Sequence, residues 1–200
     1  MGSPVDFYFE FSSPYGYIAA MIAEDAEKRL GRPMTWRPML LGPIFKITGQ
    51  QPLVSVPMKG EYSKHDFART ARRHDVPFRY PDRFPINTAA AVRAFYWVHD
   101  RDRAKARELT KALYRAYFVE NRDISAAATV VEVARSLGLD ADALAKALED
   151  PELKERAKRE VDSAIAAGVF GSPYFIVDGE PFWGVDRMPM LEDWVKSGGW

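Results

Sequence analysis

Cysteine is absent from the 200 residues of the sequence. This absence excludes disulfide bonds, thiolate ligands for a metal and a nucleophilic thiol supplied by the protein. Histidine is scarce as well, and the three that occur, His65, His74 and His99, lack the helical spacing of a metal-binding pair. We therefore expect no metal ion, either structural or catalytic.

An excess of charge of one sign is also missing. Lys plus Arg and Asp plus Glu each number 28, so the net charge is zero. Because nucleic-acid-binding proteins usually carry a basic excess, no such partner is expected. Every apolar run is too short to span a membrane, and the first residues lack the basic and apolar segments of a signal peptide. We expect a cytoplasmic protein without a membrane partner.

The most informative stretch that is present covers residues 7–20, FYFEFSSPYGYIAA. Four of the five residues 7–11 are aromatic, which favours a strand. Ser13 followed by Pro14 is typical of a helix start, and a helical apolar pattern follows from Tyr15. Ser13 therefore lies at a strand-to-helix turn, beside free backbone N–H groups that would stabilise an anion or a developing thiolate. The alternative is that Ser13 only caps the helix.

The remaining pattern predicts strands at both ends of the chain and helices between them. A strand at 34–39 completes a unit of βαβ size, and a helical turn is expected within 40–47. Short amphipathic helices follow, from 62–74 to 152–167. Their expected starts are Asn87, Asp102, Ser125, Asp140 and Pro151. Residues 173–177 and 180–183 predict a hairpin, and 187–195 a closing helix.

Because the strands are split between the two ends of the chain, they must meet in one sheet with the helical block inserted. The predicted fold is α/β, a thioredoxin-like domain (βαβ…ββα) with a large inserted all-α domain. The thioredoxin-like domain is expected at 1–40 plus 168–200, and the inserted helical domain at 41–167.

In the thioredoxin layout the first strand-to-helix turn normally holds a redox C-x-x-C motif. Here the turn reads Ser13-Pro14-Tyr15-Gly16, so disulfide chemistry is excluded, but a serine can donate a hydrogen bond to a thiolate brought by a ligand. Pro173 stands where the fold places a cis proline facing that turn, and the residue before it can pair with an extended peptide. The alternative is a trans proline that opens an edge strand.

Taken together, the motifs resemble those of the glutathione-dependent 2-hydroxychromene-2-carboxylate isomerases and the related kappa-class glutathione transferases. The resemblance covers essentially the whole chain. It rests on FYFEFSSPYGYIA, GQQPLVSVPMKGEY with Asp66 after it, VPFRYP, FPIN and VFGSPYFIVDGEPFWGVDRM. It implies a DsbA-like fold, a homodimer, and glutathione bound between the two domains.

The resemblance also implies roles along the length of glutathione. Ser13 would stabilise its thiolate, the backbone of Ser172 would pair with its cysteinyl part, and Asp186 would bind its γ-glutamyl ammonium. Lys59 would meet its glycyl carboxylate. Gln50 stands where the transferases have asparagine at that same end.

Further positions are implied around the same cleft. Pro173, Trp183 and Gly184 belong to the glutathione-binding turn, and Val185 replaces a polar residue, so only its backbone can contribute. On the substrate side, Lys46 matches a lysine of the isomerases, and Phe84 replaces a tyrosine that contacts the organic substrate. The alternatives are solvated surface lysines, aromatic residues in the core and a helix-capping role for Asp186.

The activity that the resemblance implies is isomerisation in aromatic compound catabolism. Glutathione thiolate adds to a conjugated carbon of hydroxychromene carboxylate, the ring opens, a bond rotates, and elimination gives trans-o-hydroxybenzylidenepyruvate. Glutathione is then a recycled cofactor, and the partner is a small aromatic substrate. One alternative is a kappa-class-like transferase that consumes glutathione. The other is a non-catalytic thioredoxin-fold binding or chaperone module.

Overall fold

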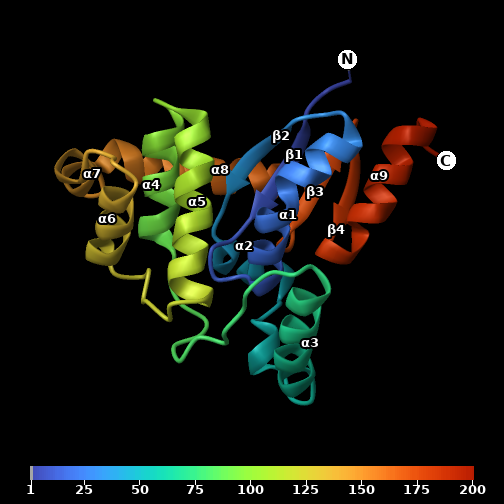
Figure 1. The fold of residues 1–200 in the computed structure, drawn as a ribbon, viewed down its shortest axis with the longest axis horizontal. Coiled ribbons are helices and arrows are strands. Elements are labelled where there is room, and N and C mark those ends of the chain that lie inside the picture. Colours follow the sequence, from blue (N-terminus) through green and yellow to red (C-terminus); the bar gives the residue numbers. More distant parts are fainter. Residues whose placement is uncertain (1) are drawn as a thin grey trace.

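Four strands form one mixed sheet in a computed structural model that describes residues 2–200 (Figure 1). The strands are β1 (Val5–Phe9), β2 (Met34–Pro38), β3 (Tyr174–Val177) and β4 (Glu180–Trp183), in the order β2-β1-β3-β4. β1 is parallel to β2 and antiparallel to β3, and β3 pairs with β4 as the expected hairpin. Strands from the two ends of the chain thus share one sheet, as predicted.

The aromatic residues of β1 hold the sheet centre. Phe7 lies opposite Trp36 of β2 and Phe175 of β3, with ring centroids 5.3 Å and 5.1 Å away. All three side chains are buried. Alternating aromatic residues on one pleated face therefore provide both the strand propensity and the core packing of the sheet.

The turn after β1 leads into α1 (Pro14–Leu30), which begins as predicted. The Ser13 hydroxyl accepts a hydrogen bond from the backbone N–H of Gly16 at 3.0 Å, and Pro14 occupies the first helical position. The helix ends at Gly31, whose φ of 63° is a left-handed conformation that glycine adopts without strain.

The other helices occupy the middle and the end of the chain. They are α2 (Leu41–Thr48), η1 (Leu53–Ser55), α3 (Lys59–Arg73), α4 (Ala89–His99), α5 (Arg103–Phe118), α6 (Ala127–Ser136), α7 (Ala141–Ala147), α8 (Pro151–Ala166), η2 (Val185–Arg187) and α9 (Met188–Ser197). In Figure 1, α4–α7 gather at the left of the sheet, α9 lies at the right, and α3 stands at the bottom, away from that group.

Two helix caps differ from prediction, and α3 begins at Lys59, three residues before its expected start at residue 62. Asp102 and Asp140 cap α5 and α7 as expected, each through its side chain. Ser125 does not cap α6, because its hydroxyl donates instead to the Asp123 carboxylate at 2.5 Å, and the helix starts after Ala126. The N-cap residue of α4 is Thr88, while the expected cap, Asn87, accepts from the N–H of Ala89.

One hydrophobic cluster runs from the sheet into the helices. Tyr17 of α1 packs on Tyr114 and Phe118 of α5, with centroid distances of 5.5 Å and 5.2 Å.

The division into domains at residues 40/41 and 167/168 stays a prediction. Among residues 2–200, no helix has the length and apolarity needed to cross a membrane.

Candidate functional site

A cavity of about 1150 Å³ opens between the Ser13 turn, the α2–α3 region, the segment 84–88 and the loops that flank β3 and β4. Nine of the predicted site residues line it: Ser13, Gln50, Lys59, Phe84, Ser172, Trp183, Gly184, Val185 and Asp186. Lys46 and Pro173 are not among its lining residues. The fold therefore gathers segments that are up to 173 positions apart, from Ser13 to Asp186, around one space.

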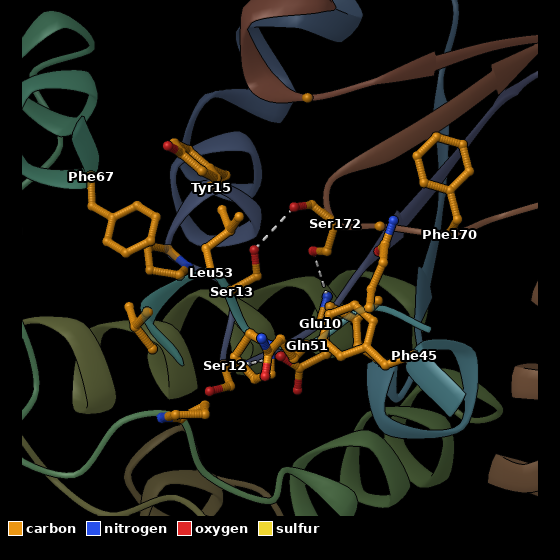
Figure 2. Close-up of a pocket in the computed structure, with 18 of the residues that line it drawn as sticks. Glu10, Ser12, Ser13, Tyr15, Phe45, Gln51, Leu53, Phe67, Phe170 and Ser172 are labelled. Atoms are coloured by element: carbon orange, nitrogen blue, oxygen red, sulfur yellow. Dashed lines mark hydrogen bonds between the residues drawn. The ribbon is translucent and has the colours of Figure 1, made fainter. Parts of the chain in front are cut away.

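At the centre of the cavity wall, the Ser13 turn meets Ser172 (Figure 2). The Ser13 hydroxyl donates to the backbone carbonyl of Ser172 at 3.1 Å while it caps α1. The Ser172–Pro173 peptide bond is cis, which confirms the prediction. A second cis bond, Phe84–Pro85, was not predicted. The arrangement places a hydroxyl, a helix N-terminus and a backbone that can pair with an extended peptide together.

Gly16 is required at the fourth position of this turn. A Cβ atom there would lie 2.7 Å from the Ser172 hydroxyl oxygen and 2.9 Å from the Tyr114 hydroxyl oxygen. Both distances are shorter than normal van der Waals contact, so a side chain would push the turn away from Ser172. The glycine thus permits the close approach of the two parts of the site.

The loop after β4 forms one end of the cavity. Gly184 has a φ of 113°, and a Cβ atom at this position would collide with the Asp186 carboxylate. The Asp186 side chain, which is 69% exposed, is within 2.8 Å of the Arg187 guanidinium. An exposed carboxylate at the rim is suited to bind a ligand cation, although Arg187 competes for it.

The other end of the cavity is formed by the segment from α2 to α3. Lys59 begins α3 and Gln50 follows α2; both are exposed and line the cavity. Lys46 is exposed on α2 and lies outside the lining, whereas its neighbour Phe45 lines the wall. Phe84 is half-buried and packs 5.2 Å from Tyr80.

Tyr15 connects the Ser13 turn to α3. Its hydroxyl donates to the Asp66 carboxylate, and its ring packs edge-on against Phe67 at 5.0 Å. Burial, followed by the bond to Asp66, raises the pKa of Tyr15, which is neutral at pH 7. Burial opposes ionisation of Asp66, but hydrogen bonds from Tyr15 and Arg69 lower its pKa overall. Asp66 belongs to one of the sequence motifs, but its contact with Tyr15 was not predicted.

Glu10 was missed as a site residue. It is 7% exposed and lines the cavity, with one carboxylate oxygen 2.8 Å from the Ser12 N–H and the other bonded to the Thr88 hydroxyl. Burial raises its pKa from 4.5 to about 7, although both hydrogen bonds oppose the shift. The sequence feature that could have indicated a site residue is that Glu10 is the single charged residue within the aromatic run 7–11.

Within residues 2–200, no cluster of three or more metal-ligating His, Cys, Asp or Glu side chains is found.

The chain is similar to known proteins over nearly its whole length. Residues 4–196 match the family model of the DSBA-like thioredoxin domain. The chain is 31% identical to a 2-hydroxychromene-2-carboxylate isomerase of Sphingobium xenophagum, over 98% of this chain and 99% of that protein. It is 26% identical to glutathione S-transferase kappa 2 of Caenorhabditis elegans, over 96% and 92% of the two chains.

A solved structure of a 2-hydroxychromene-2-carboxylate isomerase superimposes with a TM-score of 0.87 at 26% sequence identity. The match covers 96% of this chain and 94% of that one. The resemblance inferred from the sequence motifs and the predicted thioredoxin-like fold are both confirmed.

Proposed function

The chain belongs to the family of DSBA-like thioredoxin domains, and on that premise we propose that it is a glutathione-dependent enzyme, an isomerase or a transferase. More finely, we propose that it interconverts 2-hydroxychromene-2-carboxylate and trans-o-hydroxybenzylidenepyruvate. The observation that carries the proposal is the cysteine-free turn at Ser13, which is hydrogen-bonded to Ser172 of the cis Ser172–Pro173 bond in the wall of one large cavity. The 31% identity to an isomerase over nearly the whole of both chains favours that reaction over transfer.

The residues present fit glutathione by their donor and acceptor chemistry. Asp186 is an acceptor for its ammonium group, Lys59 and Gln50 are donors for its glycyl carboxylate, and the backbone beside Ser172 can pair with its peptide unit. These complementary groups line the same cavity as Ser13. Trp183, Gly184 and Val185 complete the rim beside Asp186.

Bound glutathione would supply a thiolate that adds to a conjugated carbon of the substrate and leaves after a bond has rotated. Ser13 favours the charged sulfur in two ways. Its hydroxyl can turn from the Ser172 carbonyl to donate to the sulfur, and its position places the positive end of α1 at the same point. Free thiols titrate near pH ~8.5, and such surroundings lower that value.

Part of the cavity wall is aromatic. Phe84, Phe45 and Phe170 line it, which suits an aromatic ring. Lys46 stays a predicted partner of the substrate carboxylate, from an exposed place on α2 outside the lining. Phe84 lacks the hydroxyl of the isomerase tyrosine, so its contact with the substrate would be through its ring alone.

We also propose, from the family resemblance, that the protein is a cytoplasmic homodimer that acts in aromatic compound catabolism. Sedimentation of the purified protein tests the dimer. A monomer at micromolar concentration, with and without glutathione, would contradict that part of the proposal.

An assay of the purified protein with hydroxychromene carboxylate, with and without glutathione, tests the reaction. We expect conversion only when glutathione is present, with total glutathione unchanged after many turnovers. Loss of one glutathione per substrate would identify a transferase. Absence of conversion in both arms would contradict the finer proposal.

A further inference from the structure

The Glu10 carboxyl is a buried acid to which the proposed function, centred on Ser13, assigns no part. Glu10 lies on the turn that carries Ser13, because its backbone carbonyl accepts from the Ser13 N–H at 2.9 Å. Its backbone N–H donates to the Ser172 hydroxyl at 2.9 Å, as Figure 2 shows. The main chain of Glu10 therefore joins the Ser13 turn to Ser172, the two parts of the proposed site for the glutathione sulfur (the sulfur site). Its side chain is directed elsewhere.

That side chain is directed toward the segment 84–88. The Thr88 hydroxyl donates to one carboxylate oxygen, and the N–H of Ser12 donates to the other. The hydroxyl of Ser12 in turn accepts from the N–H of Ile86 at 3.1 Å. Glu10, Ser12, Ile86 and Thr88 all line the cavity, next to Phe84. The carboxyl thus lies between the sulfur site and the predicted substrate side.

The titratable groups that face Glu10 are tyrosines of α5. The Tyr114 hydroxyl donates to the Glu10 carbonyl at 2.9 Å, and Tyr117 lies beside Ser12. Burial raises the pKa of both tyrosines, so both are neutral at pH 7. Within residues 2–200 no Lys, Arg or His forms an ion pair with Glu10. A buried carboxylate without a cation is costly, and such groups are concentrated at functional sites.

We propose that Glu10 is the acid–base group of this cavity, which moves a proton between two oxygens of an aromatic substrate while Ser13 serves the sulfur. The inference rests on the proposed function and deepens it. It names the substrate class as aromatic compounds in which a hydroxyl and a ring oxygen share one carbon.

The proton balance of ring opening fits a single carboxyl. In 2-hydroxychromene-2-carboxylate, one carbon bears both a hydroxyl and the ring oxygen. The Glu10 carboxylate takes the hydroxyl proton as the carbonyl forms, and the electron pair of the breaking carbon–oxygen bond goes to the ring oxygen. The carboxyl then returns the same proton to that oxygen, which becomes a phenol. No outside oxidant, reductant or proton is consumed.

Two variants test the role. Glu10→Gln keeps the shape and removes the titratable proton, and positioned acid–base groups contribute about 10²- to 10⁴-fold. We therefore expect isomerisation to fall by about 10²-fold or more, with glutathione affinity unchanged. Thr88→Val keeps the carboxyl but removes a donor that stabilises its charged form. The rising limb of the pH–rate profile should then move to higher pH, while the thiolate titration of bound glutathione stays in place.

A readout without substrate accompanies the assay. The Ser12 amide, which donates to the Glu10 carboxylate, should report its titration by NMR in the ligand-free protein, near pH 7 in the parent. That titration should move upward in Thr88→Val together with the pH–rate limb. Full activity of Glu10→Gln, or a limb that stays fixed while the Ser12 titration moves, would overturn the acid–base role alone. An inactive parent protein whose Ser12 amide still titrates would overturn the proposed function and this role with it.

Discussion

The two walls of the cavity are built in opposite ways. The wall at the sheet is tied by hydrogen bonds among the buried residues Glu10, Ser12 and Ser172 and the half-buried Ser13. The wall from η1 and α3 is largely exposed, with Lys59 at its start and Met58 93% exposed beside it. We infer that the sheet wall holds the chemistry, which needs fixed dipoles, and that the α3 wall recognises one end of a flexible ligand, the glycyl carboxylate of glutathione.

The largest effect of a substitution on the reaction rate is expected at Ser13, which belongs to the sheet wall. Ser13→Ala removes a donor aimed at the sulfur, and the loss of such a donor costs about 10²- to 10³-fold in rate. Glutathione binding should persist, because Ser172, Asp186 and Lys59 are unchanged, but the pKa of the bound thiol should rise. Thiolate absorbance against pH, followed beside the isomerisation rate, measures both.

Lost helix capping must be separated from lost chemistry in that variant. The cap contributes about 1 kcal/mol of stability, so Tm is recorded with activity. Ser163→Ala, at an exposed position of α8 outside the cavity, is the matched control. If the thiolate titrations of Ser13→Ala and the parent coincide and activity is kept, Ser13 is only a helix cap.

The burial of Glu10 predicts a pH-dependent contribution to stability. Its folded-state pKa of about 7 exceeds the unfolded value of 4.5, so the native state binds the extra proton between these values. The contribution of Glu10 to the free energy of unfolding should therefore be fully present below pH 4.5 and fall by about 3 kcal/mol as the pH rises through 7.

Glu10→Gln isolates this contribution, because every other titrating group is shared with the parent. Urea unfolding of both proteins between pH 4.5 and pH 8 measures it. A difference in unfolding free energy that does not change with pH would show that Glu10 titrates alike in the folded and unfolded chains.

Asp186 differs from the buried groups of the sheet wall, because its side chain is exposed although it belongs to the rim beside β4. Asp186→Asn removes one charge-assisted hydrogen bond, worth about 1.5–3 kcal/mol. Glutathione should then bind roughly ten- to a hundredfold more weakly, with Tm unchanged. Calorimetric titration tests this, with Asp193→Asn on α9 as the matched control outside the cavity. Equal affinity in parent and variant would remove Asp186 from the binding site.

The smallest effect is expected at Lys59. Exposed ion pairs are typically worth about 0.2–1 kcal/mol, so Lys59→Met should weaken glutathione binding only about two- to fivefold, and less at high salt. Lys64→Met on the same helix, outside the cavity lining, is the control. If Lys59→Met instead lowered the isomerisation rate as much as Ser13→Ala does, the division of roles between the two walls would be contradicted.

Much of the site could be predicted because its signals are local. The strand, turn and helix around Ser13 follow from alternation and a Ser-Pro helix start, and the cis bond before Pro173 follows from the layout and the resemblance. Asp102 and Asp140 are caps because their acceptors reach backbone groups three residues away. The predicted cap Ser125 was wrong because its hydroxyl donates a hydrogen bond to the nearby Asp123 carboxylate, a competing interaction that a cap pattern does not take into account.

The sequence by itself determined the order of elements, the thiol-free turn and nine of the residues that line the cavity. Only the tertiary structure decided what these residues meet. The Glu10 carboxylate is hydrogen-bonded to Thr88, which is 78 positions away in the sequence, and Tyr15 is hydrogen-bonded to Asp66, which is 51 positions away. Lys46 is exposed outside the lining although its neighbour Phe45 lines it. The physical reason is that periodicity and capping act within a few residues, whereas burial and hydrogen-bond partners arise from packing between distant segments.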